Sequence, residues 1–404
     1  MSFLAVGEKG HGNELEGGKP IVRVVFSPHA YSPSIGGAER YAQGLAEGLA
    51  GLGHEVHVVV ANVDDPEAFY ELGHRGVGPA SETIKEVSVH RLAYGDLGYR
   101  LLGNVLGVDR VLRSSTERFQ RNLGDLLSGL APDVVVTLPH LFPNVAEAVR
   151  LRAAASSWRL VYVPMLHEDD PYWSIDRVSQ AVTVADGVIA LTDYERDRLL
   201  ESYGAQPEAT AVIPPGVAFG DGTVSIDREP MVLFVGRRTP SKRLDVLYEA
   251  METVWQEFPE VLLVLAGSPP GVGADPAVWL AADQRVKVVN TPNEMEKDQL
   301  LAEAGVVVST SLTESFGITT LEAWAQGTPV VVTDSPVNRS VVRDGEDGLV
   351  AAGPGAADLA SALIPLLRDV DTAAALGRAG RRRVEADFSW SGSAALLDGL
   401  IARL

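Results

Sequence analysis

The chain has 404 residues, of which 46% are hydrophobic and 22% charged, and its formal net charge is −20. This length favours two domains of ordinary globular composition, and no uncharged run reaches the ~20 residues of a membrane span. The acidity argues against unspecific nucleic-acid binding and against adhesion to anionic membranes, because both need clustered basic residues. Cysteine is absent, which excludes disulfides and thiolate metal sites.

The first residues contain no apolar core segment. Residues 1–20 carry glycines and charges, so we expect a flexible tail there and not a signal peptide. A cytoplasmic location fits this composition.

Short β-branched runs then alternate with longer helical stretches. Ile21–Ser27 is predicted to be a strand, Ala38–Leu52 a helix and Val56–Ala61 the next strand, which is the repeating unit of a parallel sheet. The further elements expected in this half are strands at Val134–Leu138, Leu160–Pro164 and Gly187–Leu191 and a helix at Leu112–Leu130. Residues 21–213 are therefore predicted to form a doubly wound, Rossmann-like domain.

A segment rich in Gly, Pro and Asp, residues 214–230, interrupts the alternation and is predicted to be a linker. The alternation restarts over residues 231–387. Its expected strands are Met231–Val235, Val261–Ala266, Val286–Val289, Val306–Ser309 and Val330–Thr333, and its expected helices are Arg243–Glu257, Glu294–Ala304, Thr319–Gln326 and Ala374–Ala386. Ligands of parallel α/β sheets bind beyond the carboxyl ends of the strands, so two such α/β domains predict a ligand cleft between them.

The first candidate site is the stretch YSPSIGGAERY between the first strand and the first helix. Gly36 and Gly37 allow the backbone to approach a ligand closely, and the helix that follows directs its amides at the turn. This pattern is typical of a phosphate or sugar site. The alternative is a glycine turn that serves packing alone.

The second candidate is VGRRTPSKRLDVLYEAM. Arg237, Arg238, Lys242 and Arg243 crowd a strand end and a helix start, where cations are mildly unfavourable. A phosphate pair bound between Arg237 and Lys242 would relieve the repulsion and gain charge-assisted hydrogen bonds. The alternative is a solvated charged loop.

The third candidate is TESFGITTLEAWAQG, where a strand gives way to a helix. The amides from Phe316 to Thr319, around Gly317 and Ile318, are expected to face an incoming phosphate oxygen. Glu322, about one turn in, suits two adjacent ribose hydroxyls, and Glu314 suits hydroxyls of another group. The alternative, helix capping, explains Glu314 better than Glu322.

These three stretches, in this order, resemble the retaining glycosyltransferases of the GT-B fold, the large family-four (group 1) class. That family has a Gly-Gly loop after its first strand, as at residues 36–37, and G-R-x-x-x-x-K opening its second domain, as at residues 236–242. It also has E-S-F-G-x-x-x-x-E-A, as at residues 314–323. The resemblance runs from about Ile21 onward and implies an α/β protein of two Rossmann-like domains facing a cleft.

The resemblance also implies a diphosphate site. Arg237 and Lys242 are expected to bind the donor diphosphate and to stabilise it as it leaves. The turn at residues 316–318 would add backbone amides, and Gly36-Gly37 would approach the diphosphate from the first domain. Because these cations do the work of a metal, neither a metal nor another cofactor is expected.

The remaining roles concern the ribose and the transferred sugar. By resemblance, Glu322 binds the ribose hydroxyls, Glu314 contacts the transferred sugar, and His167, at a strand end, contacts the same sugar. A lone histidine is equally compatible with an ordinary surface position. The closing segment, residues 388–404, resembles the family's last helix, which crosses back onto the first domain.

The implied reaction is transfer of a hexose-type sugar, with retention, from a UDP- or GDP-sugar to an acceptor hydroxyl. Acceptor contacts are expected in His167–Trp173 and Tyr94–Arg113, which could also be ordinary surface loops. The D-x-D at Asp369–Asp371 is interpreted as a helix cap, and His54 as a turn residue.

The sequence departs from the family pattern where a Gly-Gly and a Pro-Glu are usual, since Ser335-Pro336 and Asn338-Arg339 stand there. This affects the expected lining of the sugar site more than the diphosphate site. Three alternatives remain: a sugar phosphorylase on the same fold, a sugar-nucleotide epimerase, and a non-catalytic protein that only binds sugar nucleotides. A Rossmann dehydrogenase is disfavoured because G-x-G-x-x-G is missing after the first strand.

Overall fold

The computed structural model describes residues 20–34, 36–63, 76–94, 108–139, 142–154, 156–168, 173–219, 228–270 and 274–404. The tail predicted at residues 1–20 lies outside this part of the chain, apart from Pro20. Residues 220–227 of the predicted linker also lie outside it.

The first domain is built on a sheet that, within the described residues, has eight strands in the order β3-β4-β2-β1-β5-β6-β7-β8. The pairs are parallel except for the antiparallel pair β3–β4. The strands are β1 Arg23–Pro28, β2 Glu55–Ala61, β3 Ser81–Ile84, β4 Val87–Leu92, β5 Val134–Leu138, β6 Arg159–Tyr162, β7 Gly187–Ala190 and β8 Thr210–Val212. The helices are α1 Gly37–Gly51, α3 Val108–Leu130, α4 Pro143–Ala153, α5 Ile175–Val184 and α6 Asp193–Ser202. Every residue of β5 is buried, as expected of a central parallel strand with helices over both faces.

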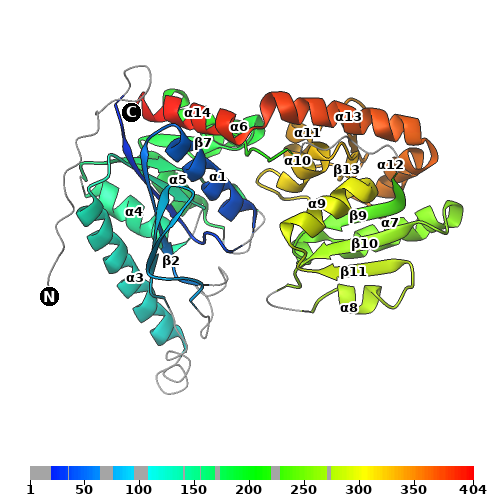
Figure 1. The fold of residues 1–404 in the computed structure, drawn as a ribbon, viewed down its shortest axis with the longest axis horizontal. Helices are drawn as coiled ribbons and strands as arrows, with labels where there is room; N and C mark the ends of the chain where they lie inside the picture. The colour runs from blue at the N-terminus through cyan, green and yellow to red at the C-terminus, as the bar shows by residue number, and fades with distance from the viewer. Residues whose placement is uncertain are drawn as a thin grey trace.

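The second domain holds a parallel sheet that, in the described part of the chain, has six strands in the order β11-β10-β9-β12-β13-β14. These are β9 Glu229–Val235, β10 Leu262–Gly267, β11 Val286–Asn290, β12 Ala304–Ser309, β13 Val330–Val332 and β14 Leu349–Val350. Its helices are α7 Leu244–Glu257, α8 Ala277–Leu280, α9 Glu294–Glu303, α10 Ile318–Ala325, α11 Pro336–Val341, α12 Ala356–Arg368 and α13 Val370–Asp387. Figure 1 shows the two domains side by side, each with helices around its sheet. None of the helices in the described ranges is long and apolar enough to span a bilayer.

Each strand and helix predicted by residue range has a counterpart in the structure, displaced by a few residues at its ends. The antiparallel β3–β4 pair was not predicted, and β9 begins at Glu229, inside the range expected for the linker. Strands β3 and β4 are short, lie at a sheet edge and bury at most alternate residues, which gives a weak sequence signal.

The last helix, α14 (Trp390–Ile401), lies against α1 of the first domain (Figure 1). Two glycines of α1 permit the close contact. A Cβ on Gly44 would lie 2.2 Å from the Trp390 ring, and one on Gly48 would lie 2.5 Å from the Ala394 Cβ. His54, interpreted from the sequence as a turn residue, is buried and lies 3.2 Å from the Asp398 carboxylate of α14.

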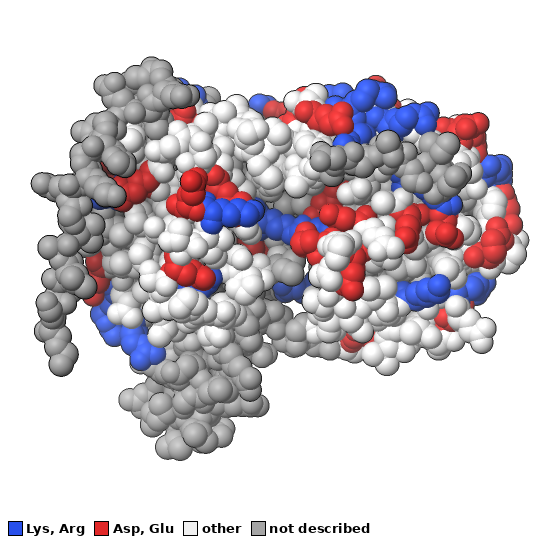
Figure 2. All heavy atoms as spheres, viewed as in Figure 1, with Lys and Arg blue, Asp and Glu red and all other residues white. Residues whose placement is uncertain are grey.

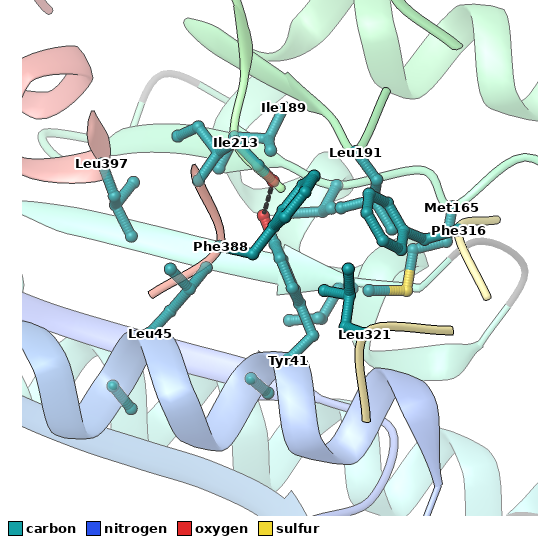
Figure 3. Close-up of a cluster of buried hydrophobic side chains, with 14 of the residues drawn as sticks. Tyr41, Leu45, Met165, Ile189, Leu191, Ile213, Phe316, Leu321, Phe388 and Leu397 are labelled. Atoms are coloured by element: carbon teal, nitrogen blue, oxygen red, sulfur yellow. Dashed lines mark hydrogen bonds between the residues drawn. The ribbon is translucent and has the colours of Figure 1, made fainter. Parts of the chain in front are cut away.

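A set of buried apolar side chains joins the two domains, and we call it the interdomain cluster. It includes Tyr41 of α1, Met165, Phe316, Leu321 of α10, and Phe388 between α13 and α14 (Figure 3). The Phe316 and Phe388 rings pack edge to face, with centroids 5.8 Å apart. The Tyr41 hydroxyl donates a hydrogen bond of 2.8 Å to the Ile213 carbonyl. The segment that carries the third sequence motif is thus anchored in the contact between domains.

Candidate functional site

Two helix N-termini face each other between the domains. Helix α1 begins at Gly37 and α10 at Ile318, and a Cβ on Gly37 would lie 3.8 Å from the Ile318 Cδ1. Gly317, with φ of 86°, is in the left-handed region that glycine adopts readily. Neither helix has a hydrogen bond from an N-cap side chain. The first-turn amides of both helices therefore present partial positive charge to the gap, which suits an anion.

The start of α1 carries a buried pair that the sequence motifs did not indicate. The Glu39 carboxylate lies beside Gly36, and its Oε1 is 3.1 Å from the His29 Nε2. Burial alone raises the pKa of Glu39, but His29, the adjacent backbone amide and Arg237 outweigh burial and hold that pKa below its ordinary value. Arg237 of the second domain thus interacts electrostatically with the Glu39 carboxylate at the start of α1. The only sequence signal for the Glu39–His29 pair is a histidine directly after β1.

The loop from β9 to α7 supplies Arg237 and Lys242. Arg237 is half-buried, and its guanidinium makes no hydrogen bond or ion pair with the described residues; its carbonyl accepts a hydrogen bond of 2.9 Å from the Thr239 amide. The Lys242 ammonium bonds the Glu314 carboxylate, and the Lys242 carbonyl accepts a hydrogen bond from the Thr310 hydroxyl. Lys242 is thus fixed at both its backbone and its side chain.

Two of the four cations in this stretch, Arg238 and Arg243, bind other groups of the protein. Arg238 is 1% exposed and donates to the Asp275 carboxylate and to the Asn290 Oδ1, each at 2.7 Å. It ties together the loops after β9, β10 and β11 and does not face the gap. Arg243 has a φ of 49° and donates to the Pro354 carbonyl at 2.8 Å. Arg237 and Lys242 therefore remain as the cations available to an anion.

Glu314 and His167 meet at a cavity of about 240 Å³ that is lined from both domains. The His167 Nε2 lies 3.1 Å from the hydroxyl of Ser315. Burial alone raises the pKa of Glu314, but Lys242, His167 and the Ser311 hydroxyl together outweigh burial and hold that pKa below its ordinary value. The structure thus brings together His167, Lys242 and Glu314, which the sequence placed in three separate segments. The same cavity is lined by Pro336 and Val337, which belong to the segment whose sequence differs from the family pattern.

Glu322 lies on α10 and is 7% exposed. Its Oε1 accepts a hydrogen bond of 2.7 Å from Lys297 of α9 and another from Arg40 of α1. Neither Glu314 nor Glu322 caps α10, so the capping alternative is wrong for both. Arg40 and Lys297 were not predicted, because nothing in their local sequence indicates a partner so distant along the chain.

Glu195 is a further buried carboxylate of the cavity that Glu314 and His167 line. It is 2% exposed, and it accepts hydrogen bonds from the amides of Leu166 at 2.7 Å and Leu191 at 2.6 Å. Burial raises the pKa of Glu195 to about 7, against these two amides, which favour the charged form. Through Leu166, Glu195 fixes the segment after β6 that carries His167.

The remaining sequence predictions fall outside the cleft or outside the described residues. In the described ranges, no group of three or more His, Asp or Glu residues is arranged to hold a metal ion. Asp369 accepts from the amides of Asp371 and Thr372 and so caps α13, as predicted. Residues 95–107 and 169–172 of the expected acceptor segments lie outside the described residues.

Comparisons with known proteins agree with this geometry. The sequence model of the family described as "Glycosyl transferases group 1" matches residues 222–383, and that of "Glycosyltransferase Family 4" matches residues 35–219. A D-inositol 3-phosphate glycosyltransferase of Nocardia farcinica is 35% identical over 248 residues, which is 56% of this chain and 54% of that relative. One from Thermobispora bispora is 32% identical over 65% of this chain and 64% of the relative. The matched region thus spans little more than half to just under two thirds of these relatives.

Solved structures show the same arrangement of domains. Sucrose-phosphate synthase from Thermosynechococcus elongatus aligns with a TM-score of 0.75 at 21% identity, covering 95% of this chain and 98% of that one. Anabaena HepE, solved in complex with UDP and glucose, aligns with a TM-score of 0.71 at 17% identity, covering 95% and 100%. The two family matches account for both domains, and the fold is GT-B. The chain belongs to the group 1 glycosyltransferases.

Proposed function

We propose that the protein transfers a hexose-type sugar from a nucleoside diphosphate to an acceptor hydroxyl, with retention of configuration and without a metal ion. One observation carries the proposal: Lys242 pairs with Glu314, which lines a cavity shared by both domains. Beside this pair, the N-termini of α1 and α10 face one another. The gap therefore offers positive charge to a diphosphate, next to polar groups for a sugar.

The diphosphate is proposed to bind to Arg237, to Lys242 and to the first amides of α10. As transfer proceeds, the bond between the anomeric carbon and the diphosphate oxygen breaks, and negative charge builds on that oxygen. Cations and amides already in place stabilise this charge more in the transition state than in the ground state. The acceptor oxygen forms the new bond to the anomeric carbon, and its proton passes to the departing phosphate. Arg237 and Lys242 thus supply the charge for which other transferases use a metal.

The sugar and the nucleoside occupy opposite sides of the diphosphate in this proposal. Glu314 and His167 would contact the transferred sugar in the cavity, and Glu322 would accept hydrogen bonds from the ribose hydroxyls. Because HepE was solved with UDP, UDP-sugars are the first donors to test and GDP-sugars the second. The relatives named as D-inositol 3-phosphate glycosyltransferases favour a polyol or sugar hydroxyl as the acceptor.

A thermal-shift series with UDP, GDP, ADP and dTDP, each with magnesium and with EDTA, tests the donor site. A ligand at about 100 times its dissociation constant adds roughly 2.7 kcal/mol to the free energy of unfolding. We expect one nucleotide to stabilise the protein equally in both conditions and to lose this effect in Lys242→Ala. Stabilisation that requires magnesium would contradict the metal-independent site.

The alternatives predict different outcomes. A phosphorylase of this fold would respond to inorganic phosphate and a sugar and to none of the four nucleotides. An epimerase would convert the sugar nucleotide without releasing nucleotide, and a sugar-nucleotide-binding protein would bind it without turnover. Once the donor is known, the anomeric configuration of the product, read by NMR, tests retention.

A further inference from the structure

Arg40 is the residue of the first domain that reaches the proposed ribose carboxylate. It lies in the first turn of α1, and its guanidinium bonds both Glu322 of α10 and Glu294 of α9. Lys297 of α9 bonds the same two carboxylates, at 2.7 Å and 2.9 Å. Two cations and two carboxylates thus form one closed network across the domain boundary. Figure 2 shows basic and acidic side chains meeting where the two domains adjoin.

The network contacts only one of the two oxygens of the Glu322 carboxylate, among the residues that the structure describes. Arg40 and Lys297 both donate to Oε1, and among the described residues no group donates to Oε2. Two donors on one oxygen restrict rotation of the carboxylate, because any rotation lengthens at least one charge-assisted hydrogen bond. The second oxygen is therefore held in a fixed direction with its acceptor capacity unused.

Burial strengthens this constraint. The Glu322 and Lys297 side chains are each 8% exposed and that of Arg40 is 24% exposed, whereas Glu294 is 59% exposed. Charge pairs near the protein interior are screened less by water and salt than surface pairs. The bonds to Glu322 thus fix geometry more firmly than those to Glu294.

We propose that Arg40 is a positioning residue of the donor site, supplied by the opposite domain. Resting on the ribose role proposed for Glu322, the inference is that Arg40 and Lys297 orient the carboxylate so that Oε2 receives the ribose hydroxyls. Lys297 belongs to the same domain as Glu322 and holds it in every arrangement of the domains. Arg40 bonds Glu322 only while the first domain is close, so ribose recognition is complete only in the closed cleft.

The test compares the affinity for UDP with that for 2′,3′-dideoxy-UDP, or for the GDP pair if UDP does not bind. Loss of hydroxyls bonded to a carboxylate weakens binding by about ten- to a hundredfold in the wild type. Glu322→Gln should lose most of this discrimination. Arg40→Met should reduce it by up to about tenfold, since a carboxylate held by Lys297 alone is less well oriented toward both hydroxyls, and Arg40→Lys should recover part of it.

The matched control is Lys85→Met. It removes another ion pair of α1, that of Lys85 with Glu47 at 3.1 Å, and should leave the ratio of affinities at its wild-type value. If Arg40→Met keeps the wild-type ratio, Arg40 serves only the contact between domains and the inference is wrong. If Arg40→Met binds UDP more tightly, Arg40 competes with the ribose, which also overturns it. A wild type that binds none of the four nucleoside diphosphates contradicts the proposed function itself, and one that binds UDP but does not discriminate the dideoxy analogue contradicts the ribose role of Glu322.

Discussion

Two carboxylates of the cleft, Glu314 and Glu322, are already paired with cations in the described structure. Glu314 accepts a hydrogen bond from Lys242, and Glu322 accepts one from Lys297. A diphosphate must therefore share Lys242 with Glu314, whereas Arg237 has no such partner among the described residues. A diphosphate that binds here must therefore compete with Glu314 for Lys242, but not for Arg237.

Glu314→Gln should separate binding from transfer. The substitution removes the negative charge that Lys242 now neutralises, so the affinity for a nucleoside diphosphate should rise by a few fold. Transfer should fall by about a hundredfold or more, because the proposed contact with the reacting sugar is lost. Calorimetric titration and initial rates measure the two effects. A drop in nucleotide affinity would show that Glu314 supports the diphosphate site instead.

Glu195 should make stability depend on pH. Its pKa is raised from 4.5 to about 7, so the folded state binds this proton more tightly than the unfolded chain does. The stability it contributes is complete below pH 4.5 and is lost as pH rises through about 7. Relative to Glu195→Gln, the wild type should lose about 3 kcal/mol of unfolding free energy over this range. Denaturant titrations at several pH values measure the difference, and a difference independent of pH would contradict the account.

At the scale of elements, α10 is held in place by a close contact with α13. A Cβ on Gly380 of α13 would lie 2.1 Å from the Trp324 ring of α10, and one on Gly377 would lie 2.0 Å from the Gly327 carbonyl. The Trp324 indole donates 2.8 Å to the Asp347 carbonyl, which fixes the ring. The helix that carries Glu322 thus depends on glycines far away in the sequence.

Gly380→Ala should destabilise the second domain by about 1–3 kcal/mol, because the added methyl group meets an aromatic ring that is already hydrogen-bonded. The matched control is Gly129→Ala in α3, where nothing lies within 4 Å of the added carbon. That variant should be neutral or more stable by up to about 1 kcal/mol. Thermal unfolding of both variants measures the contrast, and equal melting temperatures would refute the packing argument.

Local patterns predicted most elements because buried parallel strands and amphipathic helices carry strong periodic signals. The start of α10 at Gly317 followed from its turn chemistry, and so did the cap at Asp369. The pairing of Arg40 with Glu322 did not follow, because it depends on how two domains meet. The pairing of Arg238 with Asp275 was not predicted either, because Asp275 lies 37 residues away and is brought close only by the fold.

At the scale of the whole molecule, the chain crosses between the domains twice. It leaves the first domain after β8 and returns through Phe388 to α14, which packs on α1. Within the interdomain cluster, Phe388 contacts Phe316, which belongs to the turn whose amides are proposed to bind the diphosphate. The turn that carries Phe316 and the segment that returns to the first domain at Phe388 therefore pack directly against each other.

Phe388→Ala should loosen the contact between domains. Loss of a buried phenylalanine costs about 3–5 kcal/mol, and here part of that loss falls on the interdomain cluster. We expect a lower melting temperature and a larger radius of gyration in small-angle X-ray scattering. Phe258→Ala, which removes a half-buried aromatic ring that packs against the core of the second domain alone, should lower the melting temperature without the expansion. Equal radii for the two variants would contradict the link.

The central claim is that Arg237 and Lys242 stabilise a departing nucleoside diphosphate. It is tested most directly with sugar donors that carry the nucleotide identified by thermal shift: the rate at which water hydrolyses them and nucleoside diphosphate is released is measured in EDTA, in wild type and in Lys242→Met. We predict release by the wild type without metal and a rate at least about a hundredfold lower in the variant at saturating donor. Equal rates in the two proteins, or release only when magnesium is added, would contradict the account.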